Sequence, residues 1–249
     1  EPVLMWTEAR DVDAMQAALS DIIGAYERDF AKHPNAGEYP KISMVWKSVP
    51  SQLARENKKF LYKVVKDGAR AREYEDALQW LVDARLVHKV YRSSAPKLPV
   101  SAYDDLSAFK IYLVDVGLLR RLAQLAPTAF GEGNRLFTEF KGALSENYVL
   151  QSLVRQFEAA PRYWSQANPP YEVDFLVQRE NEIFPIEVKS ESNVKSRSLR
   201  KFKELFPEQV KLRIRFSLEN LKLDGDVLNI PLFMADYTDK LIGMALAAL

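Results

Sequence analysis

The sequence predicts a mixed α/β (α+β) protein, in which an N-terminal helical domain is followed by a second domain with a mixed β-sheet. Apolar residues recur at helical spacing in residues 11–33. After residue 160, short runs rich in β-branched and aromatic residues indicate strands. The 249 residues, 47% hydrophobic and 28% charged, have the ordinary balance of a globular protein with one large or two modest domains.

The first part of the chain is expected to be helical. We assign residues 1–35 to a helical lead-in, in which Asp11 caps the helix of residues 11–33. Three further helical segments follow at 41–56, 60–67 and 71–86. Two strands follow at 87–94 and 108–115, with a Pro-containing loop between them. Three helices and a two-stranded ribbon are the order of a winged helix, which we assign to 36–125. Winged helices bind DNA or serve as protein contacts, and a plain helical packing module is the alternative.

The pattern changes in the second domain, which we assign to residues 130–249. It begins with a long amphipathic helix and ends with a short one, and the predicted order is α-β-β-β-α-β, followed by one more strand and helix. In chain order the predicted elements are 137–159, 162–166, 171–178, 182–189, 196–206, 210–217, 227–233 and 236–249. Trp164, like Trp46 and Trp80, is expected to anchor a core.

Three charged side chains interrupt the apolar strands of EVDFLVQRENEIFPIEVKS, residues 172–190. A strand that buries an ion must pair it, bind a metal with it or use it. Side chains alternate across a strand, so Glu187 and Lys189 point to one face. If the two strands form a hairpin with its turn near 179–181, Asp174 lies roughly across from that pair.

Two carboxylates that lie close together repel each other, and a divalent cation removes the conflict. Oxygen ligands from few protein groups suit Mg²⁺, which keeps several waters and takes further ligands from a substrate phosphate. We therefore expect Asp174, Glu187 and the carbonyl of Val188 to hold Mg²⁺ or Mn²⁺. Lys189 would orient a water and stabilise negative charge on the phosphate.

Glu146 lies in the predicted helix 137–159, near its apolar side. Its carboxylate is placed to reach over the sheet toward the same metal. The alternative is an exposed glutamate at the helix edge.

The segment after the site is basic. Residues 189–215 contain nine Lys and Arg and three Glu, whereas the formal net charge of the whole chain is +1. A local excess of positive charge is what contact with a phosphate backbone requires, although such a run is usually a solvated face. The residues expected to bind nucleic acid are Lys195, Arg197, Arg200, Lys201 and Lys203.

The composition excludes several classes of site. There are no cysteines, which rules out disulfides, zinc–thiolate sites and a thiol nucleophile, and fits a reducing cytoplasm. No apolar run reaches the ~18–20 residues that a membrane-spanning helix needs. We therefore expect a cytoplasmic protein that makes no membrane contact.

The helical Glu146, followed by the pattern D-x12-E-x-K across a hairpin, resembles the PD-(D/E)XK nuclease superfamily, whose core is αβββαβ. The resemblance implies a restriction-endonuclease-like fold in which Glu146 and Asp174 support the metal, Glu187 binds it and Lys189 orients the water. Val173 stands where the superfamily signature has proline. Some members of the superfamily only bind, so the resemblance leaves both cleavage and binding open.

Longer strings resemble prokaryotic AAA+-type ATP-binding proteins that carry a nuclease-like C-terminal domain of unknown function. They include GARAREYEDALQWLVDARLVHKVYR, LPVSAYDDLSAFKIYLVDVGLL and EFKGALSENYVLQSL. These relatives have an N-terminal P-loop ATPase domain, whereas this sequence lacks the motif G-x-x-x-x-G-K-[ST]. The resemblance thus implies a C-terminal fragment, with ATP binding and ring-shaped homo-oligomers belonging to the missing ATPase domain.

Together, these features predict Mg²⁺- or Mn²⁺-dependent hydrolysis of nucleic-acid phosphodiesters, with DNA and RNA left open. The alternative is a non-catalytic module that binds nucleic acid or protein under the control of the missing ATPase domain. ATP hydrolysis is not expected from these residues.

Overall fold

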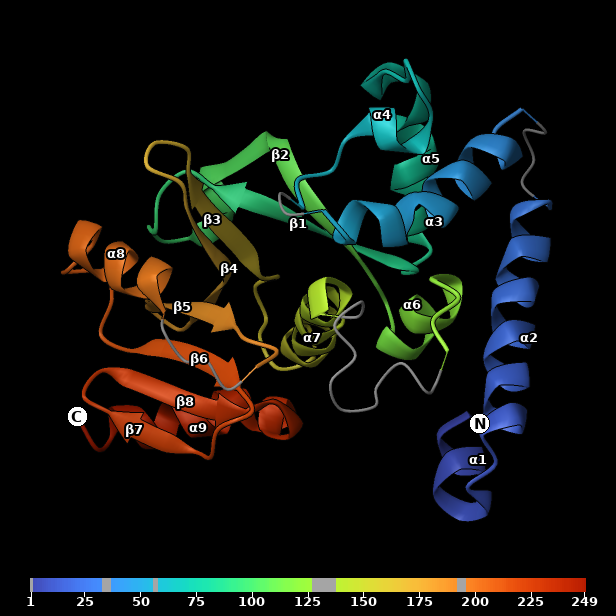
Figure 1. Ribbon diagram of the computed structural model, residues 1–249. Coiled ribbons are helices and arrows are strands. Elements are labelled where there is room, and N and C mark those ends of the chain that lie inside the picture. Colours follow the sequence, from blue (N-terminus) through green and yellow to red (C-terminus); the bar gives the residue numbers. More distant parts are fainter. Residues whose placement is uncertain (1, 33–36, 56–57, 127–137, 192–195) are drawn as a thin grey trace. The chain divides into compact units, whose positions relative to one another are not determined.

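The computed structural model describes residues 2–32, 37–55, 58–126, 138–191 and 196–249, and it confirms a mixed α/β fold (Figure 1). By its contacts the chain divides into two compact units, described separately below. The first contains Glu1–Lys89 and Ile111–Phe140, and the second contains Val90–Lys110 and Lys141–Leu249. In the described part of the chain, no helix has both the length and the apolar character needed to cross a membrane.

The first unit is helical. Asp11 caps the second helix as predicted, because its side chain accepts a hydrogen bond of 2.8 Å from the backbone N–H of Ala14. The described helices are α1 (Pro2–Ala9), α2 (Val12–Phe30), α3 (Tyr39–Leu53), α4 (Tyr62–Val65), α5 (Ala71–Asp83) and α6 (Val116–Leu122).

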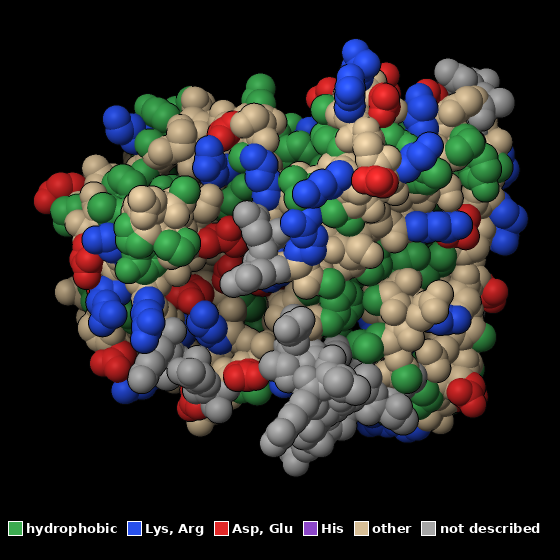
Figure 2. All heavy atoms as spheres, turned by 45° about the horizontal axis from the view of Figure 1, so that its top comes forward, with side chains coloured by type: hydrophobic (Ala, Val, Ile, Leu, Met, Phe, Trp, Pro, Cys, Tyr) green, Lys and Arg blue, Asp and Glu red, His purple; other side chains and the backbone are tan. Residues whose placement is uncertain are grey.

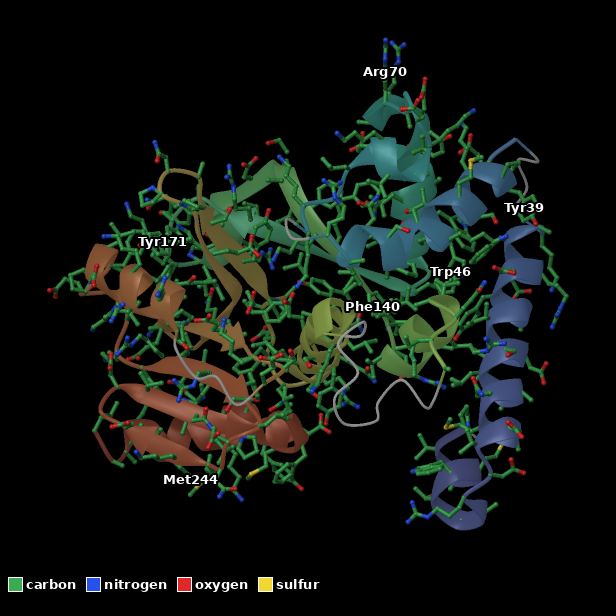
Figure 3. The ribbon with its side chains drawn as sticks, viewed as in Figure 1. Tyr39, Trp46, Arg70, Phe140, Tyr171 and Met244 are labelled. Atoms are coloured by element: carbon green, nitrogen blue, oxygen red, sulfur yellow. The ribbon has the colours of Figure 1, made fainter. Side chains whose placement is uncertain are left out.

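Aromatic side chains form the core of this unit, as the sequence predicts. Phe30 and Trp46 are fully buried, and their ring centroids lie 5.7 Å apart in an edge-to-face arrangement (Trp46 is labelled in Figure 3). Trp80 contacts Phe30 in the same way at 5.5 Å. The buried amide of Gln52 donates to the carbonyl of Leu61 and accepts from its N–H, which ties α3 to the start of α4.

The described strands form one mixed sheet in the order β2-β1-β3-β4-β5-β6-β8-β7. The neighbouring pairs from β3 to β5 are antiparallel, β5, β6 and β8 are parallel, and β7 is antiparallel to β8. The strands are β1 (Val87–Ser93), β2 (Asp104–Leu113), β3 (Arg162–Gln166), β4 (Tyr171–Arg179), β5 (Glu182–Val188), β6 (Arg213–Ser217), β7 (Lys222–Asp224) and β8 (Val227–Pro231).

The ribbon of the predicted winged helix is formed by β1 and β2, but its strands belong to this sheet. In the second unit β1 pairs in parallel with β3, where Arg92 is opposite Tyr163. The boundary between the two compact units passes through the ribbon. β2 also begins at Asp104, in a stretch that the sequence predicts as loop. Asp104 forms an ion pair of 2.9 Å with Arg162, and Asp105 pairs with Arg92.

Three helices of the second unit complete the fold: α7 (Thr138–Leu153), α8 (Arg197–Leu205) and α9 (Thr238–Leu246). α8 packs against β4 and β5 through a buried cluster in which Trp164 of β3 contacts Phe202 of α8, with centroids 5.1 Å apart. Tyr171, at the start of β4, packs against the same cluster (Figure 3). The order α-β-β-β-α-β matches the prediction, and β7 is an added strand.

Candidate functional site

The predicted hairpin forms and brings Asp174 to the end of β5. Paired residues of β4 and β5 run from Arg179 with Glu182 at the turn to Phe175 with Ile186. Asp174 is the residue before Phe175 in the chain and lies just beyond this last pair. Oδ2 of its carboxylate accepts a hydrogen bond of 2.8 Å from the N–H of Val188, so Asp174 contacts β5 directly beside Glu187. The predicted role of the Val188 carbonyl stays a prediction.

Glu187 and Lys189 lie on one face of their strand and form an ion pair. The Lys189 ammonium is 2.5 Å from Oε1 of Glu187. The Glu187 side chain is 6% exposed and the Lys189 side chain 34% exposed. The pair thus has a buried carboxylate and an ammonium that reaches solvent.

The second carboxylate oxygen of Glu187 differs from the first, which pairs with the Lys189 ammonium. Oε2 is buried and has no hydrogen-bond partner among the described residues. On the side away from β4, Glu187 is opposite Arg215 of β6, and the N–H of Lys189 donates to the carbonyl of Phe216. A buried carboxylate oxygen without a partner is costly, so it indicates a place where a further group binds.

Glu146 of α7 is buried, with an exposed fraction of 5%, so the alternative of an exposed glutamate is wrong. Its negative charge acts on both Lys189 and Lys110, which places the carboxylate in the same charged cluster. The neighbouring Asn147 is fully buried. α7 therefore presents polar groups to the interior at this point.

The carboxylates keep Lys189 charged. Burial by itself would lower the pKa of the Lys189 ammonium. The hydrogen bond with Glu187 and the negative charges of Asp174 and Glu146 outweigh burial and raise this pKa above its ordinary value. Lys189 can thus act as a fixed positive charge, and it is poorly suited to accept a proton.

The structure adds one residue that the sequence reasoning missed. Lys110 of β2 is fully buried, and its ammonium is paired with Glu172 of β4 and lies 4.8 Å from the ring centre of Tyr163. Burial would lower the pKa of Lys110, but the charges of Glu172, Glu146 and Asp174 raise it. The signal was present in the sequence, since Lys110 interrupts the apolar run AFKIYLV in the way that Asp174 and Glu187 interrupt theirs.

The basic residues expected to contact nucleic acid differ in their availability. Arg197 and Arg200 of α8 are exposed and form no ion pair within the described residues. Lys201 pairs with Glu204 at 3.3 Å, and Lys203 donates to the carbonyls of Pro207 and Val210. Lys195 lies outside the described residues. On the face drawn in Figure 2, Lys and Arg side chains are interspersed with Asp and Glu.

The donor atoms fit a weakly ligated hard cation, and they do not fit a closed cage. No group of three or more His, Asp and Glu side chains that could hold a metal is found among the described residues. Mg²⁺ needs only one or two protein carboxylates, because water and substrate supply the remaining ligands. Asp174 and Glu187 are the two carboxylates that such a site at the end of β5 would use.

Comparisons with known proteins give family assignments and no activity. Residues 141–233 match the family described as "Domain of unknown function (DUF4143)", which is commonly found at the C-termini of AAA-type ATPases. Neither the search of curated proteins nor that of solved structures gave a match. Residues 1–129 match the family described as "Domain of unknown function (DUF8612)", and the chain belongs to that family.

Proposed function

We propose that this chain is a Mg²⁺-dependent nuclease that hydrolyses phosphodiester bonds of DNA or RNA. The observation that carries the proposal is the end of β5, where Glu187 pairs with the ammonium of Lys189 and Asp174 accepts a hydrogen bond from the N–H of Val188. Oε2 of Glu187, buried and without a hydrogen-bond partner among the described residues, supports a cation at this point.

The four residues have distinct roles in this proposal. Asp174 and Glu187 hold the cation, and the buried Glu146 adds negative charge beside them. When bound, a divalent cation would supply Lewis-acid chemistry to the phosphate and would lower the pKa of a water. Lys189, kept charged by the surrounding carboxylates, positions that water and stabilises the negative charge that develops on the phosphate oxygens as the water attacks.

The exposed guanidinium groups of Arg197 and Arg200 are the best supported contacts to a nucleic-acid backbone. Arginine binds phosphate through paired N–H groups, and these two side chains are not occupied by ion pairs within the described residues. In a longer protein we propose that a winged helix and this PD-(D/E)XK-like domain follow an AAA+-type ATPase domain, through which ATP is bound and subunits associate. The frequent position of DUF4143 domains at the C-termini of AAA-type ATPases supports this arrangement.

A second function has one observation in its favour. The Lys189 ammonium is already paired with Glu187, and the described residues contain no group of three metal-binding side chains. The cluster would then be a structural ion network in a module that only binds nucleic acid or protein.

A nicking assay separates the two functions. The purified chain should cleave supercoiled plasmid or an RNA oligonucleotide in Mg²⁺ or Mn²⁺ and not in EDTA, and Lys189→Ala should abolish cleavage. Lys211→Ala is the matched control, because Lys211 also forms a Glu–Lys pair with β5, at Glu182, but is exposed. Full cleavage by Lys189→Ala would contradict the proposed site, and binding without cleavage by the wild type would favour the second function.

A further inference from the structure

Lys110 is a fully buried lysine that the proposed mechanism does not use. Its side chain has no exposed surface, and its ammonium is paired with Glu172, whose side chain is 33% exposed. The ring of Tyr163 lies 4.8 Å from the same ammonium. A buried ammonium is costly unless it is compensated, and a carboxylate and an aromatic face are the two groups that compensate it best.

The charges around Lys110 also belong to the proposed metal site. Besides Glu172, the carboxylates of Glu146 and Asp174 act on its ammonium, and their attraction outweighs burial. Glu172, the ion-pair partner of Lys110, lies two residues before Asp174 on β4, so the two carboxylates lie on the same face of that strand.

We propose that Lys110 is an internal counter-ion, whose positive charge offsets part of the negative charge of Glu172 and of the neighbouring Glu146 and Asp174 and so leaves the site to a single divalent cation. The inference rests on the proposed function, since it concerns the same cation. A second cation beside Glu146 and Glu172 would be repelled by the ammonium that already occupies this side.

This role predicts an effect of opposite sign to that of a structural anchor. Replacing Lys110 by a neutral residue of similar length removes a positive charge near the cation, so the cation should bind more tightly. If Lys110 only supported the fold, its loss would loosen the site and weaken binding. The sign of the change in affinity therefore separates the two roles.

The test is calorimetric titration of the full chain with Mn²⁺. The wild type should bind one Mn²⁺, and Lys110→Met should bind it more tightly, on the order of tenfold, with a larger Mn²⁺-induced rise in melting temperature. Glu172→Gln removes a negative charge and should weaken binding by a similar factor. It keeps the test decisive if Lys110→Met does not fold.

Arg162→Met is the matched control. Arg162 forms a largely buried pair with Asp104 in the same unit, with side chains 12% and 13% exposed, and this pair contains none of the cluster's carboxylates. It should lower stability without changing Mn²⁺ affinity. Weaker or unchanged binding by Lys110→Met, or two Mn²⁺ ions in the wild type, would overturn the inference. If Lys110→Met does not fold, unchanged binding by Glu172→Gln would overturn it. A wild type that binds no Mn²⁺ would overturn the proposed function, and the inference with it.

Discussion

The two ends of β5 carry the same chemical pair in two different environments. At the turn, Glu182 pairs with Lys211, and the side chains are 28% and 66% exposed. At the other end, Glu187 pairs with Lys189, and the corresponding values are 6% and 34%. Water can reach the polar atoms of the Glu182–Lys211 pair. Oε2 of Glu187, in contrast, is buried without a hydrogen-bond partner among the described residues.

The difference shows how burial turns an ordinary ion pair into a candidate site. Exposed pairs contribute about 0–1 kcal/mol and are screened by salt. A buried pair must offset the desolvation of both charges, and packed apolar residues often serve stability better. For Glu187 and Lys189, metal binding with catalysis is the use proposed here.

The largest expected effect is on cleavage. Glu187→Gln removes the charge that is proposed to hold the cation and should lower the rate by at least about a hundredfold. Glu182→Gln makes the same change at the other end of β5 and should leave the rate within about twofold. Plasmid nicking rates at saturating Mg²⁺ provide the measurement, and equal losses in both variants would erase the distinction between the two ends.

The next effect is on folding stability. Lys189→Met leaves the buried carboxylate of Glu187 without its ammonium partner and should lower the free energy of unfolding by about 2 kcal/mol. This loss is smaller than for a fully buried pair because Lys189 is partly exposed. Lys211→Met should cost about 0–1 kcal/mol. Urea titration without metal measures both values. A larger loss for Lys211→Met would reverse the comparison.

Mg²⁺ should stabilise the folded chain only through Glu187, at the buried end of β5. At a Mg²⁺ concentration about ten times its Kd, the wild type should gain about 1.4 kcal/mol, because the native state binds the ion and the unfolded state does not. Glu182→Gln should keep this gain and Glu187→Gln should lose it. Thermal melts with and without Mg²⁺ follow the change, and a gain retained in Glu187→Gln would place the cation elsewhere.

The smallest effect is a dependence on alkaline pH. The folded-state pKa of Lys189 is raised above its ordinary value of 10.5, so its contribution to stability is fully present below pH 10.5. This contribution is lost as the pH rises through the folded pKa. The stability difference between wild type and Lys189→Met should therefore shrink above pH 10.5, as measured by urea unfolding. A difference that stays constant would mean that the pair does not stabilise the charged lysine.

The sequence predicts the strands of the second unit well, because their apolar runs are short and bounded by turn residues. The predicted strand 162–166 is observed with the same bounds, and the hairpin turn lies at 180–181. The order of elements follows from these runs. The strands and their order can thus be predicted from local sequence patterns.

Other boundaries depend on contacts distant in sequence. α7 ends at Leu153 rather than near 159, where the side chain of Gln156 donates to the carbonyls of Ser152 and Ala235. The strand predicted at 210–217 begins only at Arg213 in the structure. Val210 and Leu212 are buried, which explains why apolar and basic residues alternate before the strand begins. The spacing of apolar residues in the sequence does not reveal contacts with residues so far away in the chain.

The candidate site divides in the same way. Asp174, Glu187 and Lys189 are close in sequence, so hairpin geometry alone suggests that they meet. Lys110 is 62 residues from its partner Glu172 and could not be assigned to the cluster by spacing. Its position in an apolar strand indicates only that it must be paired. Burial of Glu146 likewise depends on how α7 packs in the folded chain.

Crystals soaked in Mn²⁺ test the central claim most directly, through anomalous difference density collected at the manganese edge. The account predicts one peak within ligand distance of carboxylate oxygens of both Asp174 and Glu187, with the Lys189 ammonium next to it. A site that stays empty at saturating Mn²⁺, or a peak bound to other residues, would contradict it.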